Sequence, residues 1–200
     1  MKAVSAKTCG LLLPSIFFLE TSRAIWSNNI LSSYLYLVTN ENAEMIGLVS
    51  AVIGFSQLLS AIPAGYFADK YQRDVVSLIG ALFGAAALIL TCIAVYRSHL
   101  VGVIVSLMLW GIFLGITSTS TMAMFVDCIP EISRSKFLTY QVETIRVAQM
   151  IGPSISLLLF GVLGNKWTIR DCSLSIIIAQ VVCVPAIIIL YFLNDDKSSS

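Results

Sequence analysis

The segment GYFADKYQRD, residues 65–74, decides the fold of this chain. It is a short charged turn between two apolar stretches, 45–68 and 75–96, that contain no charged residue. Each stretch is long enough to cross a bilayer core as a helix, which takes about 20 residues. Charged side chains are too costly in hydrocarbon, so the turn is expected at a membrane surface. The segment therefore predicts two transmembrane helices joined as an antiparallel hairpin.

The composition favours an integral membrane protein in a lipid bilayer. Charged residues make up 12% of the 200 residues and hydrophobic residues 58%, whereas a soluble domain carries about 25% charged residues. The mean hydropathy is +0.90. A net charge of +1 gives no basis for binding nucleic acid. The five cysteines show no CxxC spacing and there is one histidine, so we predict no disulfide framework, metal site or cofactor.

Six stretches of the chain are expected to span the membrane. Four lack charged residues, a fifth contains Glu143 and Arg146, and the first contains Glu20 and Arg23. The connections are short, which leaves no room for a soluble domain. We therefore predict an all-α bundle of six transmembrane helices over residues 1–200, with spans at about 9–38, 45–68, 75–96, 100–126, 137–164 and 172–193.

The basic residues of the connections predict the orientation. With six spans, seven Lys and Arg residues lie on the side of the N-terminus and three on the opposite side. Basic connections face the cytoplasm, so both termini are expected there. An alternative is that Lys2, Lys7 and the apolar residues after them form a cleavable signal peptide. Removal of the first span would reverse the charge bias, which disfavours this alternative.

The charged turn resembles the signature of the major facilitator superfamily, which lies between the second and third spans. That signature is a Gly, three residues, an Asp, a basic residue, one residue, then Gly-Arg and a second basic residue. Four of its six positions match, at Gly65, Asp69, Lys70 and Arg73. Gln72 replaces the second Gly, and Asp74 replaces the last basic residue.

Two further segments carry the resemblance. Asp127, Pro130 and Arg134 are similar to the family's Asp-x-x-Pro-x-x-x-Arg pattern after the fourth span. Gly152-Pro153 resembles part of the antiporter motif, whose other glycines are absent. The resemblance covers nearly the whole chain but only half of a typical member, which has twelve spans in two bundles. It implies a bundle of 3+3 repeats and transport of a small solute by alternating access.

The charges at the cytoplasmic side have two interpretations. In the first, Asp69, Arg73 and Asp127 form a cluster that holds helix ends together, with Asp69 and Arg73 in pairing distance if the helix continues through them. The resemblance implies that Asp69 would also latch onto a helix of the second bundle. In the second interpretation these are solvated turn charges that only enforce topology, because surface ion pairs contribute only about 0–1 kcal/mol.

The charges inside the first and fifth spans are the candidate solute site. Glu20 and Arg23, like Glu143 and Arg146, are spaced i,i+3, so each Glu lies beside its own Arg on one helix face. Charges at this depth are costly unless they pair or line water. Gln149 falls on the same face of the fifth span, and Asn28 is adjacent to the polar face of the first span.

These six residues are therefore expected to bind a polar or charged solute. Glu20 and Glu143 are candidate carriers of a coupling proton, because burial favours the protonated form of a carboxylate. The alternative is a structural network that ties the two spans together, including the cross-pairs of Glu20 with Arg146 and of Glu143 with Arg23.

The sequence has three functional interpretations. The first is a secondary transporter or its N-terminal half, completed by a second six-helix bundle. The second is a truncated, non-transporting membrane protein that forms dimers or regulates a full-length relative. The third, an intramembrane enzyme, is disfavoured because the spans contain no Gly-x-Ser-x-Gly or His-Glu-x-x-His motif. We expect no enzymatic activity.

Overall fold

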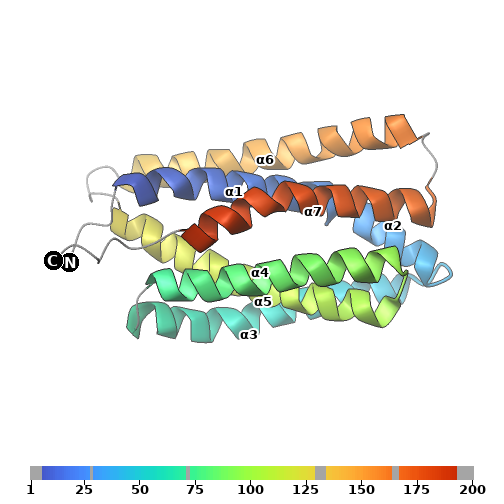
Figure 1. Ribbon diagram of the computed structural model, residues 1–200, viewed down its shortest axis with the longest axis horizontal. Coiled ribbons are helices and arrows are strands. Elements are labelled where there is room, and N and C mark those ends of the chain that lie inside the picture. The colour runs from blue at the N-terminus through green and yellow to red at the C-terminus, as the bar shows by residue number, and fades with distance from the viewer. Residues whose placement is uncertain (1–5, 28, 71–72, 129–133, 164–166, 193–200) are drawn as a thin grey trace.

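The computed structural model describes residues 6–27, 29–70, 73–128, 134–163 and 167–192. This part of the chain is built from α-helices joined by short connections (Figure 1). The helices are α1 Ala6–Trp26, α2 Asn29–Val38, α3 Ala43–Lys70, α4 Arg73–Tyr96, α5 Leu100–Cys128, α6 Arg134–Leu163 and α7 Ile169–Phe192. An all-helical bundle is the fold class that the sequence predicts.

Five helices of the described chain, α3 to α7, are long and apolar enough to cross a membrane. The first predicted span differs from them, because it is divided into α1 and α2 after Ser27. The helix α1 ends at Trp26, and Ser27 Oγ donates to the Arg23 carbonyl oxygen at 2.7 Å, a bond by which a Ser side chain competes with the helix backbone. The crossing of the bilayer by six spans stays a prediction.

Apart from the short helix α2, the helices pack in two groups of three. In one group α1 lies along α6 and α7, and in the other α5 lies along α3 and α4 (Figure 1). Contacts of α4 with α7 and of α1 with α5 join the groups. If α1 is exchanged with α5, α3 with α6 and α4 with α7, the same pairs of helices remain in contact. The contacts therefore have the twofold relation of a 3+3 repeat.

Two pairs of helices that are consecutive in the chain, α3 with α4 and α6 with α7, make only small contacts with each other. The apolar stretches around residues 65–74 form the antiparallel pair α3 and α4, but each of them packs mainly against α5. The contact between α6 and α7 is likewise small. The turn therefore sets the direction of the two helices, whereas α5 provides the surface that holds them.

Small residues permit the closest helix crossings. A Cβ on Gly115 of α5 would lie 2.5 Å from the Gln57 carbonyl oxygen of α3 and would also meet Ser60 Oγ. A Cβ on Gly152 of α6 would collide with Ala24 of α1. These two crossings correspond to one another under the twofold relation. Close backbone approach at small residues is the usual way in which helices associate in lipid.

Aromatic side chains fill the centre of the bundle. Trp110 of α5 is fully buried, lies 5.3 Å from the ring of Trp26, and donates a hydrogen bond of 3.2 Å to Thr91 Oγ1 of α4. Tyr34 of α2 is also fully buried and donates to the Val95 carbonyl oxygen at 3.3 Å. Tyr34 is thus a core residue that ties α2 to the last turn of α4.

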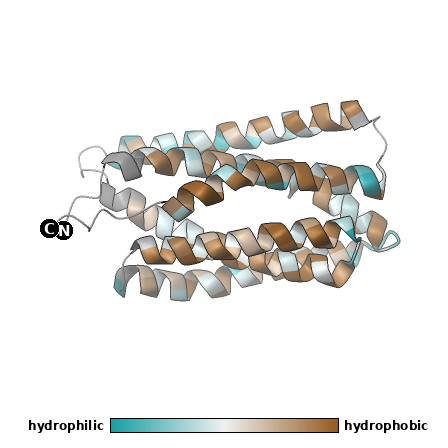
Figure 2. Ribbon diagram, in the orientation of Figure 1, coloured by the Kyte–Doolittle hydropathy of each residue, from teal (hydrophilic) through white to brown (hydrophobic). Residues whose placement is uncertain are grey.

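The outer surface of the bundle is apolar. Figure 2 shows hydrophobic residues along most of the length of the helices. The helices α3 and α6 are the least covered, with 17% of their most apolar stretches buried, compared with 39–50% for α4, α5 and α7. Lipid or another protein must cover the remaining apolar area.

Candidate functional site

The first pair of intramembrane charges forms an ion pair on α1. Arg23 Nη1 donates to Glu20 Oε1 at 2.8 Å across one helical turn. The Glu20 side chain is 15% exposed and the Arg23 side chain 36% exposed. The Arg23 guanidinium lies close to the largely covered Glu20 carboxylate. Their attraction offsets much of the free-energy cost of removing both charges from water in an apolar bundle.

The second pair does not form an ion pair. Glu143, Arg146 and Gln149 are all exposed on α6, and no salt bridge within 4.0 Å involves Glu143 or Arg146 in the described chain. The opposite face of α6 carries Ala148 and Gly152, which are buried against the bundle. The polar stripe of α6 therefore points away from its own bundle.

The crossing of α1 with α6 fixes the relative depths of these charges. Both helices run in the same direction from the same end of the bundle (Figure 1), and they meet where Gly152 lies against Ala24. At about 1.5 Å per residue, Arg23, Glu20, Arg146 and Glu143 lie roughly 1.5, 6, 9 and 14 Å from that crossing. We call these four residues the charge ladder, because the signs of their charges alternate with distance from the crossing.

The depths of these charges show whether Glu20 can pair with Arg146 and Glu143 with Arg23, the cross-pairs of the alternative interpretation. Glu20 and Arg146 differ by only about 3 Å in depth, whereas Arg23 and Glu143 differ by about 12 Å. The i,i+3 pair on α1 forms, and neither cross-pair lies within 4.0 Å. The sequence could not show this, because the depths depend on how far α6 slides along α1.

The residues of the signature motif are only partly described. Gly65 lies against α5, where an added Cβ would be 3.6 Å from Thr119 Cγ2. Lys70 Nζ donates to Tyr66 Oη at 3.3 Å. Arg134, at the start of α6, is half-buried.

Other predicted positions lie outside the described residues. The side chains of Asp69, Arg73 and Asp127, and the whole of Asn28, fall there. The helix α3 ends at Lys70 and α4 begins at Arg73, and residues 71–72 between them lie outside the described residues. The predicted cluster and latch stay predictions.

Several hydroxyl groups of α3 and α5 donate hydrogen bonds to carbonyls of their own helix. Ser60 donates to Gln57 O at 3.0 Å, and Thr119 donates to Gly115 O at 2.8 Å. Ser50 likewise donates to Ile46 O. This is the commoner use of Ser and Thr in membrane helices, so these groups serve the helices rather than the candidate solute site.

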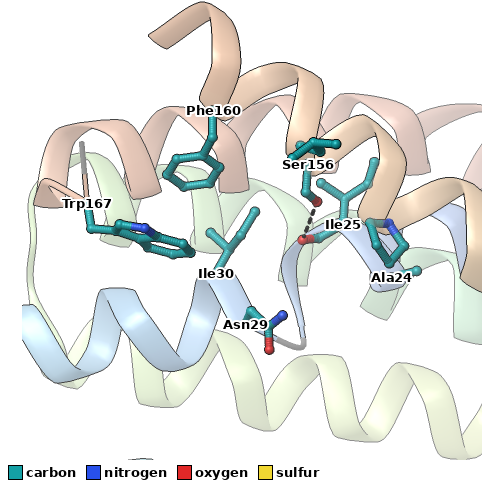
Figure 3. A pocket seen from close by; sticks show the side chains of 9 residues that line it. Ala24, Ile25, Asn29, Ile30, Ser156, Phe160 and Trp167 are labelled. Carbon is teal, nitrogen blue, oxygen red and sulfur yellow. Dashed lines mark hydrogen bonds between the residues drawn. The ribbon is translucent and has the colours of Figure 1, made fainter. Parts of the chain in front are cut away.

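A cavity at the break between α1 and α2 was not expected from the sequence. It has a volume of about 260 Å³ and lies between the α1–α2 break, α6 and Trp167 (Figure 3). Ser156 of α6 donates to the Ile25 carbonyl oxygen at 3.3 Å, which ties α6 to the end of α1. The signal that pointed to this feature was the polar run at residues 27–29 within an apolar stretch.

Gln180 of α7 is a second feature that sequence reasoning missed. Its side chain is fully buried, and neither amide atom has a hydrogen-bond partner among the described residues. Nearby on α7, the Ala179 carbonyl oxygen accepts from Ser22 of α1 at 2.8 Å. Burying an amide without a hydrogen-bond partner costs about 2–7 kcal/mol on transfer scales. Gln180 therefore lowers the stability of the bundle.

Comparison with known proteins assigns the fold to a family. The family model described as Major Facilitator Superfamily matches residues 12–200. The chain belongs to the Major Facilitator Superfamily. With its apolar helices, this member of the superfamily is an integral, multi-pass membrane protein.

One similar curated protein and no solved structure were found. This chain is 23% identical over 163 residues to a protein named Staphyloferrin A transporter from Staphylococcus aureus (strain NCTC 8325 / PS 47). The match covers 80% of this chain and 41% of that relative, so the chain spans about half the length of the curated relative it matches. No solved structure matches.

Proposed function

We propose that this superfamily member forms one six-helix half of a secondary transporter, which moves a small polar or charged solute by alternating access with both termini in the cytoplasm. The observation that carries the proposal is the exposure of Glu143, Arg146 and Gln149 on α6. These side chains lie on a helix whose apolar surface is largely uncovered by its own bundle.

The exposed charges of α6 restrict what can lie against this face of the helix in a membrane. Moving a charged side chain into the centre of a bilayer costs at least about 2.5–3.5 kcal/mol. Two charges on α6 without an ion pair therefore disfavour direct contact with lipid. A water-filled path beside α6 removes this cost, and such a path forms where two six-helix bundles face each other.

The second bundle is either a continuation of the polypeptide or a second copy of the chain. The match to 41% of the curated relative agrees with a half-length unit. Both α3 and α6 are little covered and are related by the twofold packing pattern, so they are the surfaces expected to meet the second bundle. We take the ladder charges as the solute site and Staphyloferrin A as the first solute to test.

Cysteine accessibility tests whether the polar stripe faces water. In a variant without native cysteines, single cysteines replace Glu143, Arg146 or Gln149 in proteoliposomes. We expect rapid reaction with a charged, membrane-impermeant thiol reagent. The matched control is Leu158→Cys, an exposed apolar position of α6, which should react slowly. Equal, slow reaction at all four positions would overturn the proposal.

Uptake measurements test the transport step and its coupling. With the transporter reconstituted together with its second half, Glu143→Gln should reduce uptake and flatten its dependence on pH if Glu143 carries the coupling proton. Unchanged uptake by a folded Glu143→Gln variant would reject the site. If the stripe reacts with the thiol reagent but no solute is transported, the non-transporting, dimerising alternative is favoured.

A further inference from the structure

The cavity at the α1–α2 break differs in chemistry from the charge ladder. None of the nine described residues that line it is charged. Phe160 and Trp167 form one wall, with ring centroids 4.5 Å apart and planes inclined by 27°. Figure 3 shows the two rings stacked on one side of the cavity, with Ser156 and Ala24 on the other.

Two polar groups reach this otherwise apolar space. The Asn29 amide is exposed at the start of α2 and offers two donors and an acceptor. The Ser156 hydroxyl proton is directed to the carbonyl oxygens of Ile25 and Gly152, at 3.3 and 3.1 Å. Its oxygen retains lone pairs, so Ser156 can only accept from a ligand.

The size and polarity of the cavity limit its occupant. A volume of about 260 Å³ is below the roughly 300–1,000 Å³ of sites for drug-sized molecules, so it fits one ring rather than a large solute. A charged group would lose its hydration here without an opposite charge to replace it. A flat ring can stack on the Trp167 and Phe160 wall.

We propose that this cavity binds an uncharged, planar ring with a hydrogen-bonding edge, which stacks on Trp167 and bonds to Asn29 and Ser156. Its use as a subsite for part of the transported solute rests on the proposed function, because the cavity lies on the same α1–α6 face as the charge ladder. The binding itself needs no transport and is tested separately.

Equilibrium dialysis of radiolabelled benzamide against the purified 200-residue chain in detergent tests the proposal. Benzamide is flat and uncharged, and its amide can pair with Asn29. We expect saturable binding at one site. Unlabelled cyclohexanecarboxamide, which is not planar, and benzoate, which is charged, should compete poorly.

Variants locate the site. Trp167→Leu and Asn29→Ala, both at exposed positions, should each weaken benzamide binding by about 2- to 10-fold. Phe192→Leu removes an exposed aromatic ring at the far end of α7 and should leave binding unchanged. Non-saturable uptake of benzamide, equal competition by cyclohexanecarboxamide, or unchanged binding in both variants would overturn the proposal.

The two proposals fail independently. Glu143→Gln should not change benzamide binding, because Glu143 lies outside the cavity. Loss of transport with intact benzamide binding would reject the proposed function alone. Intact transport without benzamide binding would reject the ring site alone.

Discussion

At the scale of single residues, the structure separates two charge pairs with the same local spacing. Glu20 and Arg23 form a hydrogen-bonded ion pair that is mostly covered, whereas Glu143 and Arg146 are exposed without one. The difference comes from the neighbours of each helix: α1 lies between α6 and α7, whereas α6 has one face uncovered. The first pair is thus neutralised within its own helix, whereas the second pair needs water or a partner outside this bundle.

The ion pair on α1 gives the first prediction. Arg23→Gln leaves a largely covered Glu20 carboxylate without its cation, and we expect a loss of about 1–3 kcal/mol of stability. The double variant Glu20→Gln/Arg23→Gln should recover most of that loss, because no unpaired charge remains. Thermal unfolding in detergent measures the effect, with Arg146→Gln as the matched control. A double variant no more stable than Arg23→Gln would contradict this account.

At the scale of helices, small residues determine where pairs of helices touch. Gly115 meets the backbone of α3, whereas Gly54 of α3 has no atom within 4 Å of an added Cβ. Both glycines lie inside helices, so their conformational cost is similar. They differ in packing alone, which makes them a matched pair for experiment.

Gly115→Ala should separate α5 from α3 and destabilise the bundle by about 1–3 kcal/mol. Gly54→Ala should be neutral or stabilising by up to about 1 kcal/mol, because Ala is the better helix former. Thermal unfolding of the two variants in the same detergent checks the prediction. Equal stability of both would show that the α3–α5 crossing is looser than the contacts at Gly115 imply.

At the scale of the whole molecule, the helical bundle has two poorly covered helices, α3 and α6, and a packing pattern with twofold symmetry. The uncovered surfaces of α3 and α6 are apolar apart from the polar stripe on α6. A partner that brings two such surfaces together encloses the stripe in a wet path and removes apolar area from the surroundings. The second six-helix bundle that we propose would be such a partner.

Cross-linking tests this arrangement. In the cysteine-free background, Phe55→Cys on α3 or Leu157→Cys on α6 should form an oxidative cross-link to a second bundle, seen as a band at twice the 21.7 kDa mass when the chain is expressed alone. Ile89→Cys, on the better covered α4, is the control and should remain monomeric. The arrangement is wrong if Ile89→Cys cross-links as efficiently as the other two.

The sequence by itself determined the class of fold, the approximate helix ranges and the charged turn, because apolar length and loop charge are local properties that each segment carries alone. It also identified Glu20, Arg23, Glu143 and Arg146 as charges that need a partner or water. Their i,i+3 spacing, however, is identical and could not show which pair would form.

Only the tertiary structure decided the depths and neighbours of these residues. The close approach of Gly152 to Ala24 sets Arg146 within about 3 Å of the depth of Glu20 along the helices and Glu143 about 12 Å from the depth of Arg23. The break after Ser27 opens a cavity only because α6 and Trp167 lie beside it. These features arise from contacts between segments more than 100 residues apart in the chain, and such contacts depend on how side chains interlock rather than on any local pattern of hydropathy.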